Sequence, residues 1–209
     1  MILPRPRVLL ITNRTQAHRP LTEVVDGALA GGCRWISVRE KDLPTGERRR
    51  LGRDIVKRAA AFGATVTLHG DIASAEAARA AGVHVPFGTA PGAIKAILGK
   101  AAIVGVSVHS WEEAERAQED GADYLTVSPV FETASKPSYG PALGLEILGE
   151  FCAALDIPVI ALGGITGRTA GQCIDAGAAG VAVMGEIMRA DDPKAAMAEI
   201  VAGVEGACS

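Results

Sequence analysis

A short pattern that recurs four times constrains the fold of this chain more than any other feature. In each copy a helix-forming segment ends in glycine, a tight turn follows, and an apolar run of strand-forming residues comes next. Glycine suits this position because the residue after a helix often has a positive φ, which glycine adopts without strain. The glycine turns lie at residues 30–33, 80–82, 120–123 and 175–178. The repeat predicts a chain built from alternating helices and strands.

Apolar runs and Ala- and Arg-rich segments alternate along the whole chain. We expect strands at residues 8–12, 35–39, 65–68, 83–85, 103–107, 124–128, 159–162 and 181–184. We expect helices at residues 22–30, 45–62, 72–80, 91–98, 144–154, 168–176 and 193–204, and one more after Ser110, which with Glu113 matches a capping box. Eight alternating units predict one α/β domain over residues 1–209, a closed (β/α)8 TIM barrel. A doubly wound open sheet is the alternative, because periodicity does not show closure.

Composition narrows the classes of partner. The net charge is −3, which gives no reason to expect a nucleic acid or an anionic membrane as partner. The apolar run near the start, residues 8–11, is too short for a secretory signal or a membrane span. The four cysteines, Cys33, Cys152, Cys173 and Cys208, form no C-x-x-C pair. We therefore expect reduced thiols, no zinc site and a cytoplasmic protein.

The expected seventh and eighth strands both end in glycine. The runs at residues 159–162 and 181–184 each stop where glycine begins. A barrel places its usual phosphate site after these two strands, and glycines leave backbone N–H groups uncovered there. The N–H groups that we expect to bind a phosphate belong to Gly163, Gly164, Met184 and Gly185.

Two cations follow the expected second strand. Arg39 and Lys41 alternate after a largely apolar run, and we interpret them as an anion site that faces the glycines. A salt bridge with Glu40 or Asp42 at the rim is the alternative. Cations on one side and a phosphate site on the other predict a substrate with negative charge at both ends.

Two histidines directly follow strands. His109 lies between the fifth strand and a capped helix, where a near-neutral imidazole can take and give a proton. We interpret His109 as a catalytic acid/base, and a hydrogen bond to the helix start is an equal alternative. His69 follows the third strand and Ser107 ends the fifth, so both are candidates for binding polar groups of a substrate.

The segment at residues 130–143 carries hydroxyls and an ammonium between glycine and proline residues. Such groups bind phosphate oxygens. We interpret Thr133, Ser135 and Lys136 as part of a lid over an anion, with a surface loop as the alternative.

Taken together, these strand ends resemble the thiamine phosphate synthase and TenI superfamily. The matching pieces occur in family order over nearly the whole chain and are specific as a set. They are residues 38–41, 82–85, 105–110, 120–124, 128–136, 160–165 and 180–184. The resemblance implies a barrel that holds a thiazole phosphate at the glycines after its last two strands.

The superfamily has two main activities, and departures from one pattern favour the other. The synthase joins a pyrimidine pyrophosphate to thiazole phosphate and needs magnesium, whereas TenI-type tautomerases aromatise a thiazole phosphate carboxylate without metal. His69-Gly70 stands where the synthase has Asn-Asp, and residues 86–89 hold no carboxylate. Ser37 stands where the synthase usually has a Gln that meets the pyrimidine. These departures fall on the binding of the pyrimidine pyrophosphate and of magnesium, which is bound through oxygens, carboxylates above all.

We therefore expect a metal-independent isomerase, a thiazole tautomerase in which His109 moves the ring proton. The first alternative is a thiamine phosphate synthase, with magnesium as a cofactor only in that case. Further alternatives are a non-catalytic binder of thiazole or thiamine phosphate, and another phosphate-binding barrel such as a sugar-phosphate isomerase. The expected partner is a small thiazole phosphate, and a homo-oligomer stays open.

Overall fold

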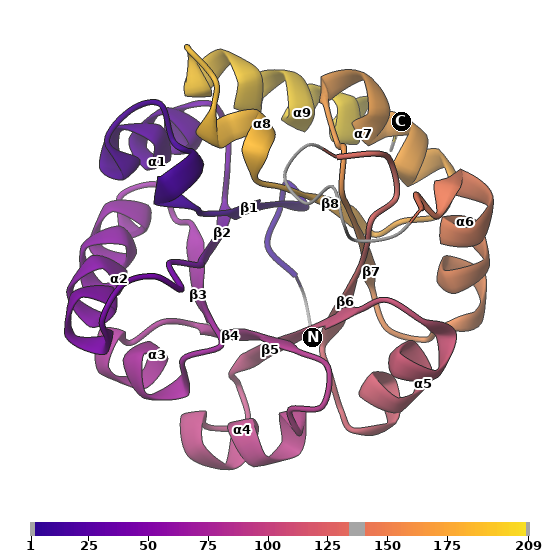
Figure 1. Ribbon diagram of the computed structural model, residues 1–209, viewed down its shortest axis with the longest axis horizontal. Helices are drawn as coiled ribbons and strands as arrows, with labels where there is room; N and C mark the ends of the chain where they lie inside the picture. The colour runs from indigo at the N-terminus through magenta and orange to yellow at the C-terminus, as the bar shows by residue number, and fades with distance from the viewer. Residues whose placement is uncertain (1–2, 134–140, 208–209) are drawn as a thin grey trace.

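The computed structural model describes residues 3–133 and 141–207. Eight parallel strands close into a barrel in chain order, and helices surround it (Figure 1). The strands are β1 Val8–Ile11, β2 Trp35–Val38, β3 Thr65–His69, β4 Gly82–Pro86, β5 Ile103–Val108, β6 Tyr124–Val127, β7 Val159–Leu162 and β8 Gly180–Val183. The helices are η1 Arg14–Gln16, α1 Leu21–Ala30, α2 Thr45–Ala60, α3 Ile72–Ala78, α4 Pro91–Leu98, α5 Trp111–Glu119, α6 Gly144–Ala154, α7 Gly167–Asp175, α8 Gly185–Met188 and α9 Pro193–Ala207. The predicted (β/α)8 barrel is confirmed.

The alternative of an open sheet is wrong because the first strand pairs with the last. Val8 lies opposite Val181, and Leu10 lies opposite Val183. Closure pairs the backbone groups that two edge strands would otherwise expose. The short helix α8 was not expected, because a single turn leaves too little periodicity to detect.

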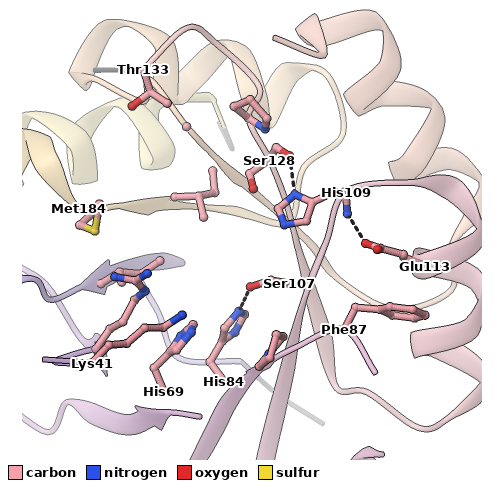
Figure 2. A pocket seen from close by; sticks show the side chains of 16 residues that line it. Lys41, His69, His84, Phe87, Ser107, His109, Glu113, Ser128, Thr133 and Met184 are labelled. Atoms are coloured by element: carbon pink, nitrogen blue, oxygen red, sulfur yellow. Dashed lines mark hydrogen bonds between the residues drawn. The ribbon is translucent and has the colours of Figure 1, made fainter. Parts of the chain in front are cut away.

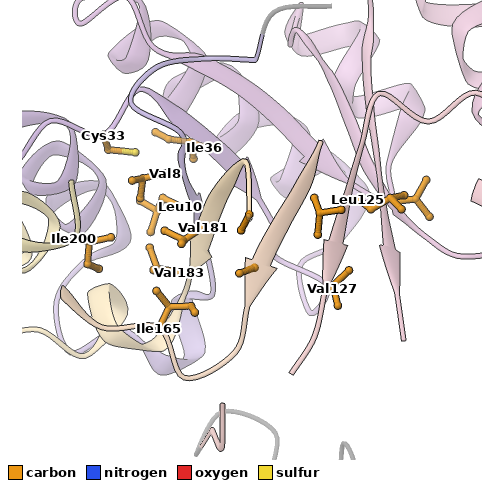
Figure 3. Close-up of a cluster of buried hydrophobic side chains, with 14 of the residues drawn as sticks. Val8, Leu10, Cys33, Ile36, Leu125, Val127, Ile165, Val181, Val183 and Ile200 are labelled. Atoms are coloured by element: carbon orange, nitrogen blue, oxygen red, sulfur yellow. The ribbon is translucent and has the colours of Figure 1, made fainter. Parts of the chain in front are cut away.

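Apolar side chains pack in two regions, one outside the sheet and one inside the barrel. The outer region lies between the strands and the helices, and Figure 3 shows part of it around Val8, Leu10, Val181 and Ile200. The inner region consists of Leu3, Leu9, Ile11, Trp35, Ile103, Tyr124, Ile160 and Ala182. Burial of both regions excludes water from the two faces of every strand, as a parallel sheet requires.

The side chains that point into the barrel change from apolar to polar toward the carboxyl ends of the strands. Alternate residues of a strand share one face, so the inward position after Trp35 on β2 is Ser37, and the one after Tyr124 on β6 is Thr126. Ser37 and Thr126 are fully buried. A polar layer therefore separates the apolar interior from the mouth of the barrel, where a site can form.

Candidate functional site

Adjoining cavities open at the carboxyl ends of the strands. The central cavity has a volume of about 330 Å³. A cavity of about 240 Å³ shares Gly163 and Met184 with it, and one of about 370 Å³ shares Lys41 and His69 with it. Of the predicted site residues, the central cavity is lined by Arg39, Lys41, His69, Ser107, His109, Thr133, Gly163 and Met184. Gly164 and Gly185 line the smaller cavity, whereas Ser135 and Lys136 lie outside the described residues.

The smaller cavity is the glycine site that the strand ends predict. Gly163 and Gly164 have φ values of 103° and 66°, which strain any residue with a Cβ. A Cβ on Gly164 would lie only 2.5 Å from the carbonyl oxygen of Glu132. On the other side, α8 begins at Gly185, and the first N–H groups of a helix have no partner within it. The glycines therefore leave backbone N–H groups uncovered at this cavity, and Arg189 adds a cation to its lining, which suits a phosphate.

The larger flanking cavity lies at the opposite side and is lined by cations. Its cations are Lys41 and Arg48, and the rest of its wall is formed by His69, Gly70, Ile72, Val85, Pro86 and Thr89. Arg48 on α2 donates from Nε to Asp71 Oδ2 at 2.7 Å, which holds its guanidinium at the cavity wall. Sequence reasoning missed Arg48, because it stands in a run of three arginines and only the helix orientation tells which one turns inward.

The alternative of a rim salt bridge for the two strand-end cations finds no support in the described residues. Asp42 forms an ion pair with Arg14, and Glu40 accepts a hydrogen bond from the Arg14 backbone N–H at 2.9 Å. Glu40 is buried, and burial raises the pKa of its carboxyl group. These two acids therefore hold the loop after β1, and Arg39 and Lys41 line the central cavity.

His109 sits at the far wall of the central cavity in a defined orientation. Its Nδ1 lies 3.0 Å from the Ser128 carbonyl oxygen, which can only accept, so the hydrogen is on Nδ1 (Figure 2). Its backbone N–H donates to Glu113 Oε2 at 2.7 Å. The expected capping box is therefore displaced: Ser110 caps α5 by accepting from the Glu113 N–H, but the Glu113 side chain reaches back to His109.

A buried histidine forms part of the wall of the central cavity. His84 is 1% exposed, and its ring stacks on that of His69 with centroids 5.3 Å apart. Its Nε2 lies 2.7 Å from the Ser107 hydroxyl and its Nδ1 2.9 Å from the Tyr124 hydroxyl. Burial, with a smaller contribution from the nearby charge of Arg39, lowers the pKa of His84 to about 3. The ring is therefore neutral at ordinary pH.

This pKa predicts a specific loss of stability in acid. An unfolded histidine has a pKa near 6.5, so between about pH 6.5 and pH 3 the unfolded chain binds one more proton at His84 than the folded chain. The stability that neutral His84 confers is complete above that window and is lost as the pH falls through it. We expect this residue to lower the free energy of unfolding by about 2 kcal/mol between pH 7 and pH 5.

Urea unfolding at both pH values measures this loss. His84→Gln removes the titrating ring, so its free energy of unfolding should fall by about 2 kcal/mol less than that of the wild type over the same interval. Subtracting the loss of the variant from that of the wild type removes the contributions of other titrating groups, such as Glu40. Equal losses in the two proteins would show that His84 titrates normally in the folded state.

The side chains around the cavities do not fit a carboxylate-held metal ion. Among the residues that the structure describes, no three His, Cys, Asp or Glu side chains come together to hold one. The carboxylates nearest the central and cation-lined cavities are engaged: Asp71 accepts from Arg48 and from the Ser74 N–H, and Glu113 accepts from the His109 N–H. Two further carboxylates, Glu132 and Glu186, line the glycine-walled cavity on the other side. Pro86 and Phe87 occupy the wall at the end of β4. In the part of the chain that the structure describes, no cluster of free carboxylates therefore stands at the cation-lined cavity to hold magnesium.

Comparison with known proteins identifies the family. A family model described as thiamine monophosphate synthase matches residues 8–187. The chain belongs to the thiamine monophosphate synthase family. A thiamine-phosphate synthase of Roseiflexus castenholzii is 40% identical over 191 residues, which cover 90% of this chain and 84% of that protein. One of Moorella thermoacetica is 39% identical over 202 residues, covering 95% and 96%.

A solved structure agrees with these relatives of the thiamine monophosphate synthase family. The thiamine phosphate pyrophosphorylase from Pyrococcus furiosus superposes with a TM-score of 0.87 at 32% identity, and the match covers 97% of each chain. The predicted superfamily is confirmed. No helix among the described residues has both the length and the apolar character to cross a membrane.

The predicted activity, a thiazole tautomerase, is wrong. The relatives at about 40% identity are named thiamine-phosphate synthases, which are transferases and not isomerases. The prediction gave decisive weight to the missing carboxylates at the ends of β3 and β4. Those losses affect one way of binding a diphosphate, but they leave the glycine-walled cavity and the cation-lined cavity in place. With the isomerase, the proton transfer assigned to His109 is also withdrawn.

Proposed function

We propose that this chain is a thiamine phosphate synthase, which joins a pyrimidine diphosphate to a thiazole phosphate. One observation carries the proposal: the central cavity continues into a glycine-walled cavity on one side and a cation-lined cavity on the other. Two phosphorylated reactants need two anion sites with a space for two rings between them. The names of the relatives support the same reaction.

The placement of the reactants follows from the charges. The thiazole phosphate binds with its phosphate at Gly163, Gly164 and Gly185, where backbone N–H groups suit a compact anion. The pyrimidine diphosphate binds with its diphosphate toward Lys41 and Arg48. The positive side chains there balance the negative charge of the diphosphate, which is larger than that of the thiazole phosphate. The two rings then meet in the central cavity, between Ser107 and His109.

The reaction in this arrangement is a substitution at carbon. The bond between the pyrimidine methylene carbon and the diphosphate oxygen breaks, and the diphosphate leaves with that electron pair. The thiazole nitrogen supplies the pair for the new carbon–nitrogen bond. Cations fixed beside the leaving group stabilise the negative charge that develops on it, and the cavity wall holds the two rings in line.

Magnesium, which the synthases of this superfamily need, would serve the same leaving group. The described side chains do not fit a magnesium ion held by carboxylates, so we infer that Arg39, Lys41 and Arg48 supply the charge on the protein side. We further infer that the partners are small phosphorylated molecules and that the protein acts in the cytoplasm, since Cys33, Cys152 and Cys173 are free thiols.

A coupling assay tests the proposed function. The protein is incubated with the pyrimidine diphosphate and the thiazole phosphate, with and without magnesium, and thiamine phosphate and pyrophosphate are measured. We expect equal amounts of both products over many turnovers. Omitting the thiazole phosphate is the control and should abolish thiamine phosphate. Absence of product under both metal conditions, with enzyme equal to substrate, would refute the proposal.

A further inference from the structure

One row of the barrel brings a tyrosine and a histidine together across an intervening strand. The Cα atoms of His84, Gly105 and Tyr124 are paired in register across β4, β5 and β6. Because Gly105 has no side chain, the Tyr124 ring lies over β5, and its hydroxyl reaches His84 Nδ1 at 2.9 Å. Trp35 packs against the ring edge to face, with centroids 4.7 Å apart. The ring is fully buried and has one place to lie.

The other nitrogen of His84 faces the cavity wall. Its Nε2 lies 2.7 Å from Ser107 Oγ, and Thr126 Oγ1 lies 3.3 Å from both atoms. Figure 2 shows His84 directed at Ser107, which lines the central cavity. His84, which is 1% exposed in the cavity wall, and the fully buried Tyr124 therefore hold the Ser107 hydroxyl at a place that a ligand can touch.

The positions of the hydrogens decide which group donates in each hydrogen bond between Tyr124, His84 and Ser107. Burial raises the pKa of Tyr124, so its hydroxyl keeps its hydrogen, and among the described residues His84 Nδ1 is the acceptor within reach. If Tyr124 donates to Nδ1, the hydrogen of the neutral imidazole is on Nε2 and is donated to Ser107. The opposite tautomer would leave the tyrosine hydrogen buried without an acceptor, which is costly.

Ser107 accepts the last hydrogen bonds of this series. Its oxygen accepts from His84 Nε2 and from the Thr126 hydroxyl, which donates at 3.3 Å. Both lone pairs of a hydroxyl oxygen are then used, and its own hydrogen is left for the cavity. The low pKa of His84 supports the neutral ring that this count requires.

We propose that Tyr124 and His84 are positioning residues that make Ser107 a hydrogen-bond donor to the bound substrate. Ser107 then selects ligands that present an acceptor, such as an unprotonated ring nitrogen or a phosphate oxygen, and disfavours those that present an N–H at this point. A serine without such neighbours can rotate and serve either partner. The hydrogen count is independent of the reaction, whereas the identity of the ligand depends on the proposed function.

The tautomer can be measured directly. The full-length protein with 15N-labelled histidine is studied by long-range 1H–15N correlation, and the His84 signals are assigned by their loss in His84→Gln. We expect a neutral ring with hydrogen on Nε2 from pH 6 to pH 8. In Tyr124→Phe the donor to Nδ1 is gone, and we expect a mixture of both tautomers. Hydrogen on Nδ1 in the wild type would overturn the proposal.

Binding of thiamine phosphate, measured by calorimetry, tests the consequence. We expect Ser107→Ala and Tyr124→Phe each to weaken binding by about 5- to 10-fold, a typical effect of one hydrogen bond. The double variant should bind no more weakly than Ser107→Ala, because both changes remove the same donor. Thr67→Val is the matched control: its buried hydroxyl donates to the Ile36 carbonyl and not to this group of residues.

The outcomes separate this inference from the proposed function. If the fold losses of affinity in the two single variants multiply in the double variant, Tyr124 acts independently of Ser107, and the inference is overturned. If Thr67→Val weakened binding as much as Tyr124→Phe, a general loss of packing would explain both, again against it. If the wild type keeps hydrogen on Nε2 but binds no thiamine phosphate, the proposed function fails while the direction of the Ser107 hydroxyl stands.

Discussion

Replacing Lys41 by alanine should lower kcat/KM for the coupling reaction by about 100- to 1,000-fold, the usual effect of removing one group that stabilises developing charge. Lys41 lines the central cavity (Figure 2), and it also lines the cation-lined cavity. It therefore lies where the bond to the leaving diphosphate is broken in the proposed reaction. Because the charge on the leaving group grows as the bond breaks, we expect most of the loss in kcat. Steady-state kinetics with both substrates varied measures it.

Lys57→Ala is the matched control for Lys41→Ala. Lys57 lies in the last turn of α2, and in a (β/α)8 barrel this helix end is opposite the active face. The same charge is removed, so the net charge of the protein changes equally in the two variants. We expect kcat/KM within about twofold of the wild type, as for a surface substitution remote from the site. Similar rates in the two variants would remove Lys41 from the diphosphate site.

Gly105→Ala should destabilise the fold by about 3 kcal/mol or more, at the upper end of the costs of overpacking a core. The added Cβ would lie 2.0 Å from Cζ and 2.4 Å from the hydroxyl oxygen of Tyr124. The ring has no room to retreat, because Trp35 packs against it and both side chains are fully buried. Either the ring or strand β5 must move. Urea unfolding with a fixed m-value measures the loss.

Gly92→Ala provides the comparison for Gly105→Ala. Gly92 lies in α4, and a Cβ there would meet nothing within 4 Å. Alanine has the higher helix propensity, so we expect a gain of up to about 1 kcal/mol. An equally stable Gly105→Ala variant would mean that Tyr124 can leave its place over β5, and the row that joins it to His84 would then be loosely held.

Much of the fold follows from local sequence signals, but closure of the barrel does not. The glycine turns and the Ser110 cap mark where helices end and begin because they act on neighbouring backbone groups. The pairing of Val8 with Val181 depends on residues far apart in the chain, and no local pattern reports it. The number of alternating units favoured a closed barrel, but it left the open sheet as an alternative that the pairing of β1 with β8 excludes.

The site divides in the same way. Arg39, Lys41 and the glycines after β7 were predicted, because strand ends of a barrel meet at one face whatever the details of packing. The engagement of His84 with Ser107 and Tyr124 depends on register across three strands, and on a glycine in the middle one. The activity was mispredicted because the absence of carboxylates after β3 and β4 was taken as evidence against the synthase reaction.

The pairing of β1 with β8 also bears on how the protein is made. A ribosome releases Val8 long before Val181, and these two residues must pair before the barrel is closed. Until then the first strand offers an unpaired edge to other nascent chains. Since contacts between distant parts of a chain slow folding, the final seam should be the slowest step and the moment of greatest need for chaperones.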